Sequence, residues 1–471
     1  MKREGTMADT AHPGMVQGIS IRKRIWGWYF FDWASQPYNT LMLTFIFGPY
    51  FAQTATAQLM SDGMTQQAAA AQAQAWWGYG LTVTGILIAV LAPVLGSVAD
   101  STGKRMPWIW LFSILYFIGA MGTWWSAPEA FNPVLVLAFF GIGMIGMEFA
   151  TIFTNSYLPS MGPKKELGRI SGSGWAFGYV GGVVALIIML MLFQAGASGK
   201  TMAGLSPLFG LDSATKADTR IVGPLTAMWF LVFMIPFFLW VRDEKNEPRL
   251  KYRFGKGVTD LVQTLKNLPG NPSLLAYLGS SMFYRDALNG MYTFGGIYAV
   301  GVLGWSITQI GIFGISAALS GAIFCWIAGY IDRAIGPKPV IVACCLIMML
   351  TALLIISLTP TSVLWFAVED GSALPDQMFY LAGILIGAAG GVLQSSSRNM
   401  LTRQGNPERM TEAFGLYALS GKATSFLAPA LIALVSDITG SQRLGVTPLV
   451  FLFALGLFLL LWVKPDGEPE T

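Results

Sequence analysis

At Gly96-Ser-Val-Ala-Asp100-Ser-Thr-Gly103-Lys104-Arg105, a short polar loop separates two long apolar stretches of the chain. Glycine allows a sharp reversal and a close approach of helices, and an aspartate stabilises the N-terminus of a neighbouring helix. Lysine and arginine are enriched in loops on the cytoplasmic side of a membrane. The stretch therefore indicates a tight cytoplasmic loop between two membrane-spanning helices.

The composition of the whole chain agrees with a membrane protein. Of the 471 residues, 54% are hydrophobic and 11% are charged, whereas soluble domains average ~25% charged residues. A helix needs about 20 mostly apolar residues to cross the hydrocarbon core. We therefore expect an all-α integral membrane protein with twelve transmembrane helices. The expected spans are 27–53, 76–98, 107–126, 131–158, 169–195, 221–241, 272–302, 307–330, 339–358, 378–400, 413–436 and 447–463.

Basic residues decide the orientation of these spans. With both termini in the cytoplasm, 23 of the 29 lysines and arginines fall in cytoplasmic segments or at the cytoplasmic ends of spans, and 4 fall in outside loops, as the positive-inside rule requires. The longest cytoplasmic connection begins with the charged run RDEKNEPRLKYRFGK and indicates a solvated linker between halves. We expect a cytoplasmic tail, an N-terminal half, a linker, a C-terminal half and a cytoplasmic tail at 1–24, 25–241, 242–270, 271–463 and 464–471.

The second half repeats features of the first. After span eight comes Gly329-Tyr-Ile-Asp332-Arg333-Ala-Ile-Gly336-Pro-Lys338, a looser copy of the loop after span two. Span four ends with Asn155-Ser-Tyr-Leu-Pro159 and span ten with Gln394-Ser-Ser-Ser-Arg398, each followed by a basic loop. Two similar halves in the same orientation are typical of parallel-repeat transporters.

These features resemble the major facilitator superfamily. Gly96–Arg105 matches every fixed position of that superfamily's loop signature, G-x-x-x-D-x-x-G-[RK]-[RK]. Further segments are similar to the vacuole-effluxer-like permeases, the autophagy-related branch with many bacterial members. They are Phe31–Tyr38, Asn155–Pro159, Gly174–Gly182, Tyr284-Arg285-Asp286 and Gly390–Arg398.

The resemblance covers nearly the whole chain and carries expectations about fold and function. It implies twelve helices in two six-helix bundles, with alternating access around a central cavity. It also implies proton-coupled movement of a solute, and amino acids are a suggested cargo of the eukaryotic relatives. Span seven departs from the family, which often has Asn-Asp-Gly where this chain has Arg285-Asp286-Ala287. That departure changes the charge of this part of the expected cavity.

Few charges lie within the spans. A charged side chain at the centre of a membrane helix costs about 2.5–3.5 kcal/mol on insertion scales, so such residues usually face a cavity and pair. The candidates are Asp32, Glu148, Arg285, Asp286 and Lys422.

Helical spacing groups these charges with polar neighbours on single helix faces. The stripes fall in spans one, four, seven and ten, which line the cavity in the superfamily. We expect them to form a substrate or proton pathway to which Asp286 and Lys422 also contribute. The stripes are Asp32, Ser35, Gln36 and Asn39; Glu148, Thr151 and Asn155; Arg285, Asn289 and Tyr292; and Gln394, Ser397 and Arg398.

Each pathway residue has a functional and a structural interpretation. Glu148 or Asp32 could titrate during transport, or Asp32 could only cap or pair with a neighbour. Arg285 could hold an anionic group such as a substrate carboxylate, contact Glu148, or pair structurally. Arg285 and Asp286 point about 100° apart on a helix, so each should find its partner on another helix. Lys422 has a structural or a gating role.

Two further sets of residues are expected where helices slide or where the cytoplasmic side opens. Glycines at every fourth position of span five indicate tight helix packing or a sliding surface; they are Gly174, Gly178 and Gly182. The two related loops indicate a cytoplasmic gate, the alternative being that they only set topology and cap helices. The gate residues are Gly96, Asp100, Gly103, Lys104, Arg105, Asp332 and Arg333.

Several kinds of site are not indicated. The single histidine, His12, lies in the polar N-terminal tail, which argues against a histidine-based metal site or a serine–histidine hydrolase. The three cysteines lie in apolar stretches and suggest no disulfide framework. The run Gly141–Gly146 fits a dinucleotide pattern but follows no strand, and Gly415 and Gly421 are one residue too far apart for a phosphate-binding loop. We expect no metal, no cofactor and no nucleic-acid partner.

The sequence thus predicts a secondary active transporter rather than an enzyme. We expect it to move a small polar solute, with an amino acid or similar metabolite as the first guess, by proton-coupled alternating access. The expected setting is the bacterial inner membrane, and the expected state is a monomer. The alternatives are a non-transporting receptor or sensor on a transporter scaffold and a membrane-embedded lipid-modifying enzyme.

Overall fold

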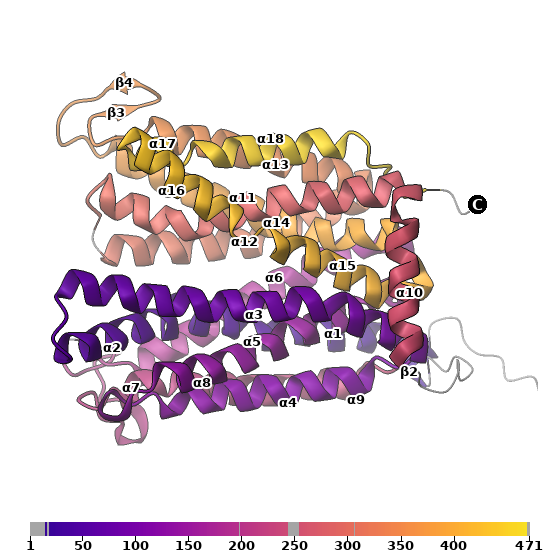
Figure 1. Ribbon diagram of the computed structural model, residues 1–471, viewed down its shortest axis with the longest axis horizontal. Helices are drawn as coiled ribbons and strands as arrows, with labels where there is room; N and C mark the ends of the chain where they lie inside the picture. The colour runs from indigo at the N-terminus through magenta and orange to yellow at the C-terminus, as the bar shows by residue number, and fades with distance from the viewer. Residues whose placement is uncertain (1–14, 17, 197, 244–253, 306, 469–471) are drawn as a thin grey trace, which may run out of the picture.

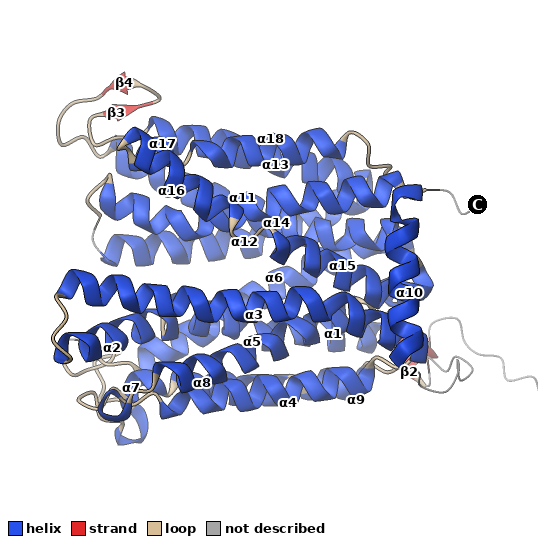
Figure 2. Ribbon diagram, in the orientation of Figure 1, coloured by secondary structure: helices blue, strands red, loops and turns tan. Residues whose placement is uncertain are grey.

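The computed structural model describes residues 15–16, 18–196, 198–243, 254–305 and 307–468. Most of the expected N-terminal tail and part of the linker therefore lie outside the described residues. Long helices run side by side in Figure 1, with the first half of the chain in one group and the second half in another. Figure 2 shows that the described residues are almost entirely helical, apart from two short hairpins.

The N-terminal half begins with a hairpin of β1 (Met15–Val16) and β2 (Ile19–Ser20). Its helices are α1 (Ile21–Pro37), the π-helix η1 (Tyr38–Phe45), α2 (Phe47–Ser61), α3 (Gln66–Thr102), α4 (Met106–Gly122), α5 (Pro133–Asn155), α6 (Leu167–Ile188), α7 (Ala217–Arg220), α8 (Val222–Phe233) and α9 (Ile235–Trp240).

The C-terminal half follows α10 (Phe254–Asn267), which lies across the other helices at one end of the molecule. We call this end, where the C-terminal segment also lies, the linker end (Figure 1). The elements are α11 (Pro272–Gly301), α12 (Ile307–Ile335), α13 (Pro337–Ser357), β3 (Ser362–Val363), β4 (Phe366–Ala367), α14 (Leu374–Gln404), α15 (Met410–Ala423), α16 (Leu427–Thr439), α17 (Gln442–Gly445) and α18 (Thr447–Leu460).

Ten helical stretches of the described residues are long and apolar enough to cross a membrane. The expected spans 27–53 and 272–302 are not among them. In the first, α1 gives way after Pro37 to a π-helix, and a new helix begins at Phe47. The second is one continuous helix, α11, whose central part carries two charged residues and an asparagine. The first segment is too interrupted, and the second too polar, to count as a long apolar helix.

Two other expected spans differ in their bounds. The helix expected at 76–98 already begins at Gln66, where the Thr65 hydroxyl accepts a hydrogen bond from the Ala68 amide. The span expected at 413–436 is broken between Ala423 and Leu427. Pro429 explains part of this break because it has no amide hydrogen to donate to residue 425.

The two halves approach each other closely along two pairs of helices, α3 with α15 and α6 with α12. A Cβ atom on Gly96 would lie 2.6 Å from the carbonyl oxygen of Thr411, and one on Gly415 would lie 2.5 Å from that of Ala92. The second pair is similar, since a Cβ on Gly172 would lie 2.5 Å from the carbonyl oxygen of Cys325. Small residues thus bring the backbones of the halves into contact.

Candidate functional site

Arg398 joins the two halves of the protein near the linker end. It lies on α14 and is buried. Its guanidinium donates to the Asp32 carboxylate at 3.1 Å and to Asn155 Oδ1 at 3.1 Å. It also donates to the hydroxyl and the carbonyl of Ser171, at 2.9 and 2.8 Å, and stacks 4.4 Å from the ring of Trp28. One side chain of the C-terminal half therefore contacts α1, α5 and α6 of the N-terminal half.

The glycines of span five make room for this contact. A Cβ on Gly174 would lie 2.7 Å from Asp32 Oδ2, and one on Gly178 would lie 3.1 Å from the Asp32 carbonyl. A Cβ on Gly182 would lie 2.9 Å from Gln36 Cγ. The glycine stripe of α6 therefore packs directly against α1.

A second ion pair joins the halves farther from the linker end. Lys422 Nζ on α15 lies 2.8 Å from Glu148 Oε1 on α5, and both side chains are partly exposed. Arg285 on α11 instead donates to the carbonyl of Tyr417 at 2.8 Å and stacks over its ring at 4.0 Å. The cation bonded to Glu148 is therefore Lys422.

Asp286 contacts a different helix from its neighbour Arg285. It is fully buried, and its Oδ2 accepts a hydrogen bond of 2.8 Å from the amide of Ala428, at the start of α16. Ala428 lies just after the break in span eleven, so Asp286 caps the second part of that span. A carboxylate is favourable at the N-terminus of a helix.

The remaining polar residues of the expected pathway are less tightly bound. Asn289 and Tyr292 on α11 are exposed, and Asn39 and Gln394 are half-buried. The hydroxyl of Tyr292 lies within hydrogen-bonding reach of Gln394 and of Tyr179 on α6. Tyr179 was not predicted from the sequence, although its α6 position beside the glycine stripe places it on the contact between halves.

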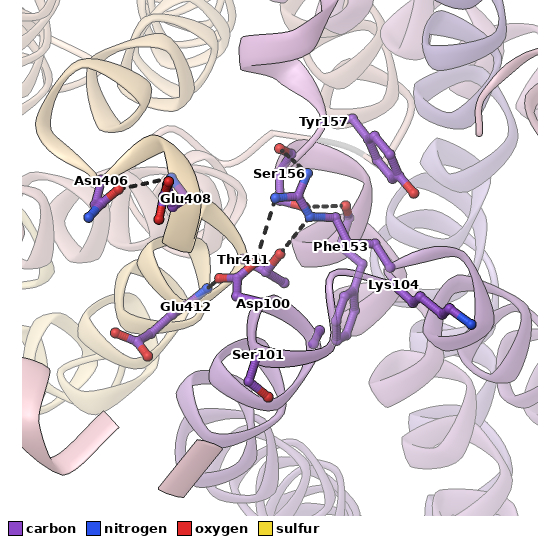
Figure 3. A network of polar contacts seen from close by, with 12 residues as sticks. Asp100, Ser101, Lys104, Phe153, Ser156, Tyr157, Asn406, Glu408, Thr411 and Glu412 are labelled. Carbon is purple, nitrogen blue, oxygen red and sulfur yellow. Dashed lines mark hydrogen bonds and ion pairs between the residues drawn. The ribbon is translucent and has the colours of Figure 1, made fainter. Parts of the chain in front are cut away.

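The loop after α3 forms a polar network with the start of α15 (Figure 3). Asp100 Oδ2 accepts a hydrogen bond of 2.7 Å from the Glu412 amide, and Asp100 lies 3.6 Å from the Arg105 guanidinium. Arg105 donates to the Thr411 hydroxyl at 3.0 Å and to the Ser156 carbonyl at 3.2 Å. The loop therefore ties the ends of α3 and α5 to α15.

Two glycines and a lysine complete this loop. Gly103 ends α3 with φ of 67°, a conformation that glycine adopts readily. Gly96 provides the close approach to α15 described above. The side chain of Lys104 points away from the network in Figure 3 and is exposed.

Asp243, just after the last helix of the N-terminal half, was missing from the sequence prediction. Its carboxylate accepts hydrogen bonds from the amides of Arg105 and Met106, at 3.1 and 3.2 Å, and from the hydroxyl of Tyr157. Burial and the neighbouring Asp243 charge raise the pKa of Tyr157 well above its usual range. Asp243 lies in a run of charges that resembles an ordinary solvated linker, so only the fold reveals its place.

The last turn of α12 makes a related contact with α6. Asp332 accepts a hydrogen bond of 2.7 Å from Asn399 and lies against Gly168, where a Cβ would come within 2.5 Å of Oδ1. Arg333 forms an ion pair of 2.6 Å with Glu166 just before α6. Asp100 and Asp332 thus occupy similar places, each beside the start of a helix from the opposite half.

The segment after α18 also connects the two halves at the linker end. Asp466 lies 2.9 Å from Lys164 of the N-terminal half and 3.3 Å from Arg403 at the end of α14. These two cations lower the pKa of the Asp466 carboxyl, with the hydrogen bond from Lys164 as the largest cause. The segment therefore bridges both halves at the linker end.

The described residues contain no group of three or more histidine, cysteine, aspartate or glutamate side chains placed to hold a metal ion. Their polar side chains instead form pairs and networks between helices. Several of these contacts hold the two halves together.

The sequence matches a family described as "Vacuole effluxer Atg22 like" over residues 20–167 and 163–467. Among its relatives, the uncharacterized MFS-type transporter YxiO of Bacillus subtilis is 25% identical over 451 residues, covering 94% of this chain and 95% of that protein. Autophagy-related protein 22-1 of Neosartorya fischeri is 24% identical over 313 residues, or 63% of this chain. The match spans 48% of that fungal protein, about half its length.

Solved structures of major facilitator transporters share the fold. The human organic anion transporter MFSD10 superposes with a TM-score of 0.65 at 16% identity, over 93% of this chain and 99% of that chain. The proton:xylose symporter XylE gives a TM-score of 0.66 at 12% identity, over 94% of both chains. The described helices therefore form an all-α major facilitator fold.

Proposed function

The chain belongs to the Atg22-like vacuole effluxer family, and from that membership we propose that it moves a small polar solute across a membrane by alternating access. It is an integral, multi-pass membrane protein with relatives and fold neighbours among transporters rather than enzymes. An amino acid or a similar metabolite is the proposed cargo, and a proton is the proposed coupling ion. Neither a receptor function nor lipid chemistry is favoured by any contact described above.

We propose that the fold has twelve spans in two six-helix bundles. The two added to the ten apolar stretches are the interrupted segment α1–η1–α2 and the polar helix α11. The bundles comprise 25–241 and 271–463, with the linker at 242–270 and tails at 1–24 and 464–471. Both tails and the linker end are assigned to the cytoplasm because 23 of the 29 basic residues lie on that side. The proposed setting is a bacterial inner membrane, with the chain as a monomer.

One observation carries the proposal: Arg398 bonds three helices of the opposite half through buried, charge-assisted contacts. Breaking such a bond leaves an uncompensated buried charge, which is costly. The contact therefore suits a closed state of the linker end that solute or proton binding must release. Together with the Asp100 and Asp332 networks it forms the proposed cytoplasmic gate.

The proposed solute path lies between the halves, farther from the linker end than Arg398. Glu148 and Lys422 form its centre because they belong to opposite halves and remain partly exposed. A solute carrying both charges, such as an amino acid, could replace this pair with one contact to each side chain. Polar side chains extend the proposed path along the neighbouring helices: Gln36, Asn39, Arg285, Asn289, Tyr292 and Gln394.

The test is a ligand screen followed by flux. Purified protein is screened by thermal shift against amino acids, sugars and nucleosides, because a ligand that binds only the folded state raises its stability. The compound with the largest shift is then followed, radiolabelled, into proteoliposomes with and without an inward proton gradient. We expect an amino acid to be the strongest ligand and the gradient to drive its accumulation.

The gate is tested in the same flux assay, at equal amounts of folded protein and against Arg403→Ala as the matched control, by Arg398→Ala. It removes the contact between halves, so gradient-driven accumulation should fall even where ligand binding persists. Stabilisation by sugars or nucleosides alone would overturn the proposed cargo. Equal accumulation with and without the gradient would overturn the proposed proton coupling.

A further inference from the structure

Asp286 is a buried carboxyl group in which only one of the two oxygens has a hydrogen-bond partner among the described residues. Its side chain is fully buried in α11. Oδ2 accepts the hydrogen bond from the Ala428 amide, whereas Oδ1 has no hydrogen-bond partner among the described residues. Capping of α16 therefore accounts for one oxygen and leaves the other unexplained.

Cations on α11 and on two helices that pack against it, α15 and α14, are bound elsewhere. Arg285, the next residue, is directed to Tyr417, and Lys422 on α15 is paired with Glu148. Arg398 on α14 is paired with Asp32. Asp32 and Glu148 thus each have a cation, and Asp286 has no ion pair in the described part of the chain.

The other helices that pack against α11 bring little charge to this site. The range of α18 contains no titratable side chain. On α13 the titratable groups are the buried thiols of Cys344 and Cys345 and, in the first turn, Lys338, which donates to the carbonyl of Val463. On α16 the acidic residue is Asp437, nine residues beyond Ala428 and hence about 14 Å along the helix. Arg443 of the short α17 lies farther along the chain, beyond that end of α16.

An unpaired anion in such a site is far more costly than a neutral acid. An ionised carboxylate without a cation is strongly disfavoured in an apolar medium, so such a group takes up a proton instead. A proton on Oδ1 leaves Oδ2 free to accept the Ala428 hydrogen bond. Protonation thus removes the unpaired charge and keeps the hydrogen bond from Ala428, so the site fits a neutral carboxyl better than an anion.

We propose that Asp286 is the site of the coupling proton, held on Oδ1 in this conformation. The coupling role rests on the proposed transport function, whereas the bound proton does not. Loss of the proton would restore the negative charge at the start of α16, and an anion binds a helix N-terminus more strongly than a neutral acid. Protonation of Asp286 would thus change how firmly α11 holds the second part of the broken span eleven.

The bound proton is tested by infrared spectroscopy of the full-length protein in lipid at pH 7. A protonated carboxyl has a C=O stretching band that is separate from the bands of carboxylate and amide groups. We expect this band in the wild type and its loss in Asp286→Asn, which keeps an oxygen to accept the Ala428 hydrogen bond. Asp32→Asn and Glu148→Gln should retain the band, because those carboxylates are paired with arginine and lysine.

A second measurement needs no substitution. Wild-type protein with ¹³C in its aspartate carboxyls should show the same band at a lower frequency. Absence of a ¹³C-shifted band would overturn the proposal, as would a band that persists in folded Asp286→Asn. If the band is lost in Asp286→Asn but proton-driven flux is unchanged, the proton is bound there and the coupling role is overturned.

Discussion

Arg398 and Asp32 form an ion pair between the two halves of the protein, with 3.1 Å between Nη1 and Oδ2. They are 366 residues apart in the sequence and lie on α14 and α1. The pair is embedded among a serine, an asparagine and two tryptophan rings. It is therefore the contact whose loss should separate the halves most.

Replacing Arg398 by alanine should destabilise the protein strongly. The substitution leaves Asp32, whose side chain is 14% exposed, without its cation, and breaking a buried pair in this way costs about 3–5 kcal/mol. Thermal unfolding in detergent, followed by tryptophan fluorescence, measures the loss. Arg403→Ala on the same helix is the control, because its partner Asp466 is exposed and such pairs contribute about 0–1 kcal/mol. Equal melting temperatures for the two variants would contradict a central role of Arg398.

Asp100→Asn should loosen the contact between α3 and α15 without preventing folding. The asparagine keeps an acceptor for the Glu412 amide but loses the charge at the start of α15, which is worth about 0.3–1 kcal/mol. The loosening is followed by maleimide labelling in nanodiscs of a cysteine introduced at the buried position Ser97. If about 0.3–1 kcal/mol less free energy is needed to open the contact, the cysteine should react roughly two- to fivefold faster.

The exposed neighbour Lys104 supplies the control for this labelling. Lys104→Ala removes a charge from the same loop but no contact with α15, so the reactivity of the cysteine should not change. If both variants label at the wild-type rate, the Asp100 network only caps a helix and does not hold the gate.

Gly174→Ala should weaken the packing of α6 on α1. The new Cβ would lie 2.7 Å from Asp32 Oδ2 and 2.8 Å from the ring of Trp28, and overpacking of this kind costs about 1–3 kcal/mol. Gly85→Ala in α3 is the matched control, because no atom lies within 4 Å of its added Cβ. Unfolding measurements should show a lower melting temperature for Gly174→Ala and an unchanged melting temperature for Gly85→Ala.

The C-terminal segment should detach from the linker end at low pH. The folded pKa of Asp466 is lowered by Lys164 and Arg403, so its contribution is present above the ordinary aspartate pKa. That contribution is lost as pH falls through the lowered value. A nitroxide at the exposed position Pro465 should become more mobile in this acidic range.

Lys164→Ala removes the largest cause of the shift and should move the transition to higher pH. Because Asp466 is exposed, the stabilisation at stake is small, about 0–1 kcal/mol. A label that is equally mobile at neutral and acidic pH would show that these cations do not hold the segment.

The sequence predicts the helical membrane fold well because apolar length is a property of each segment by itself. It predicts less well where a helix is interrupted, at the π-helix after Pro37 and at the break before Leu427, because apolar length does not register an interruption. Both interruptions occur in or beside the expected pathway. Apolar length therefore identifies the scaffold better than the parts that carry polar residues.

The candidate site shows the same limit. Helical spacing placed Asp32 and Arg398 on polar faces of their own helices, but it could not indicate that the two faces meet. It suggested Arg285 as a possible partner of Glu148, whereas the structure pairs Glu148 with Lys422 and directs Arg285 to Tyr417. Which side chains form an ion pair depends on how helices distant in the sequence pack together. The periodicity of a single helix carries no information about that packing.

Glu148 and Lys422 should bind solute as a unit. If a zwitterionic solute replaces their ion pair, Glu148→Gln and Lys422→Gln should each abolish most of the thermal shift caused by the strongest amino acid ligand. The double variant should lose little more than either single one, because residues that act together are not additive. Exchanging the charges, as Glu148→Lys with Lys422→Glu, should restore part of the shift, since the pair and its spacing of 2.8 Å would be re-formed in reverse. Additive losses in the double variant, with no recovery on exchange, would show that the two side chains act separately and that the solute binds elsewhere.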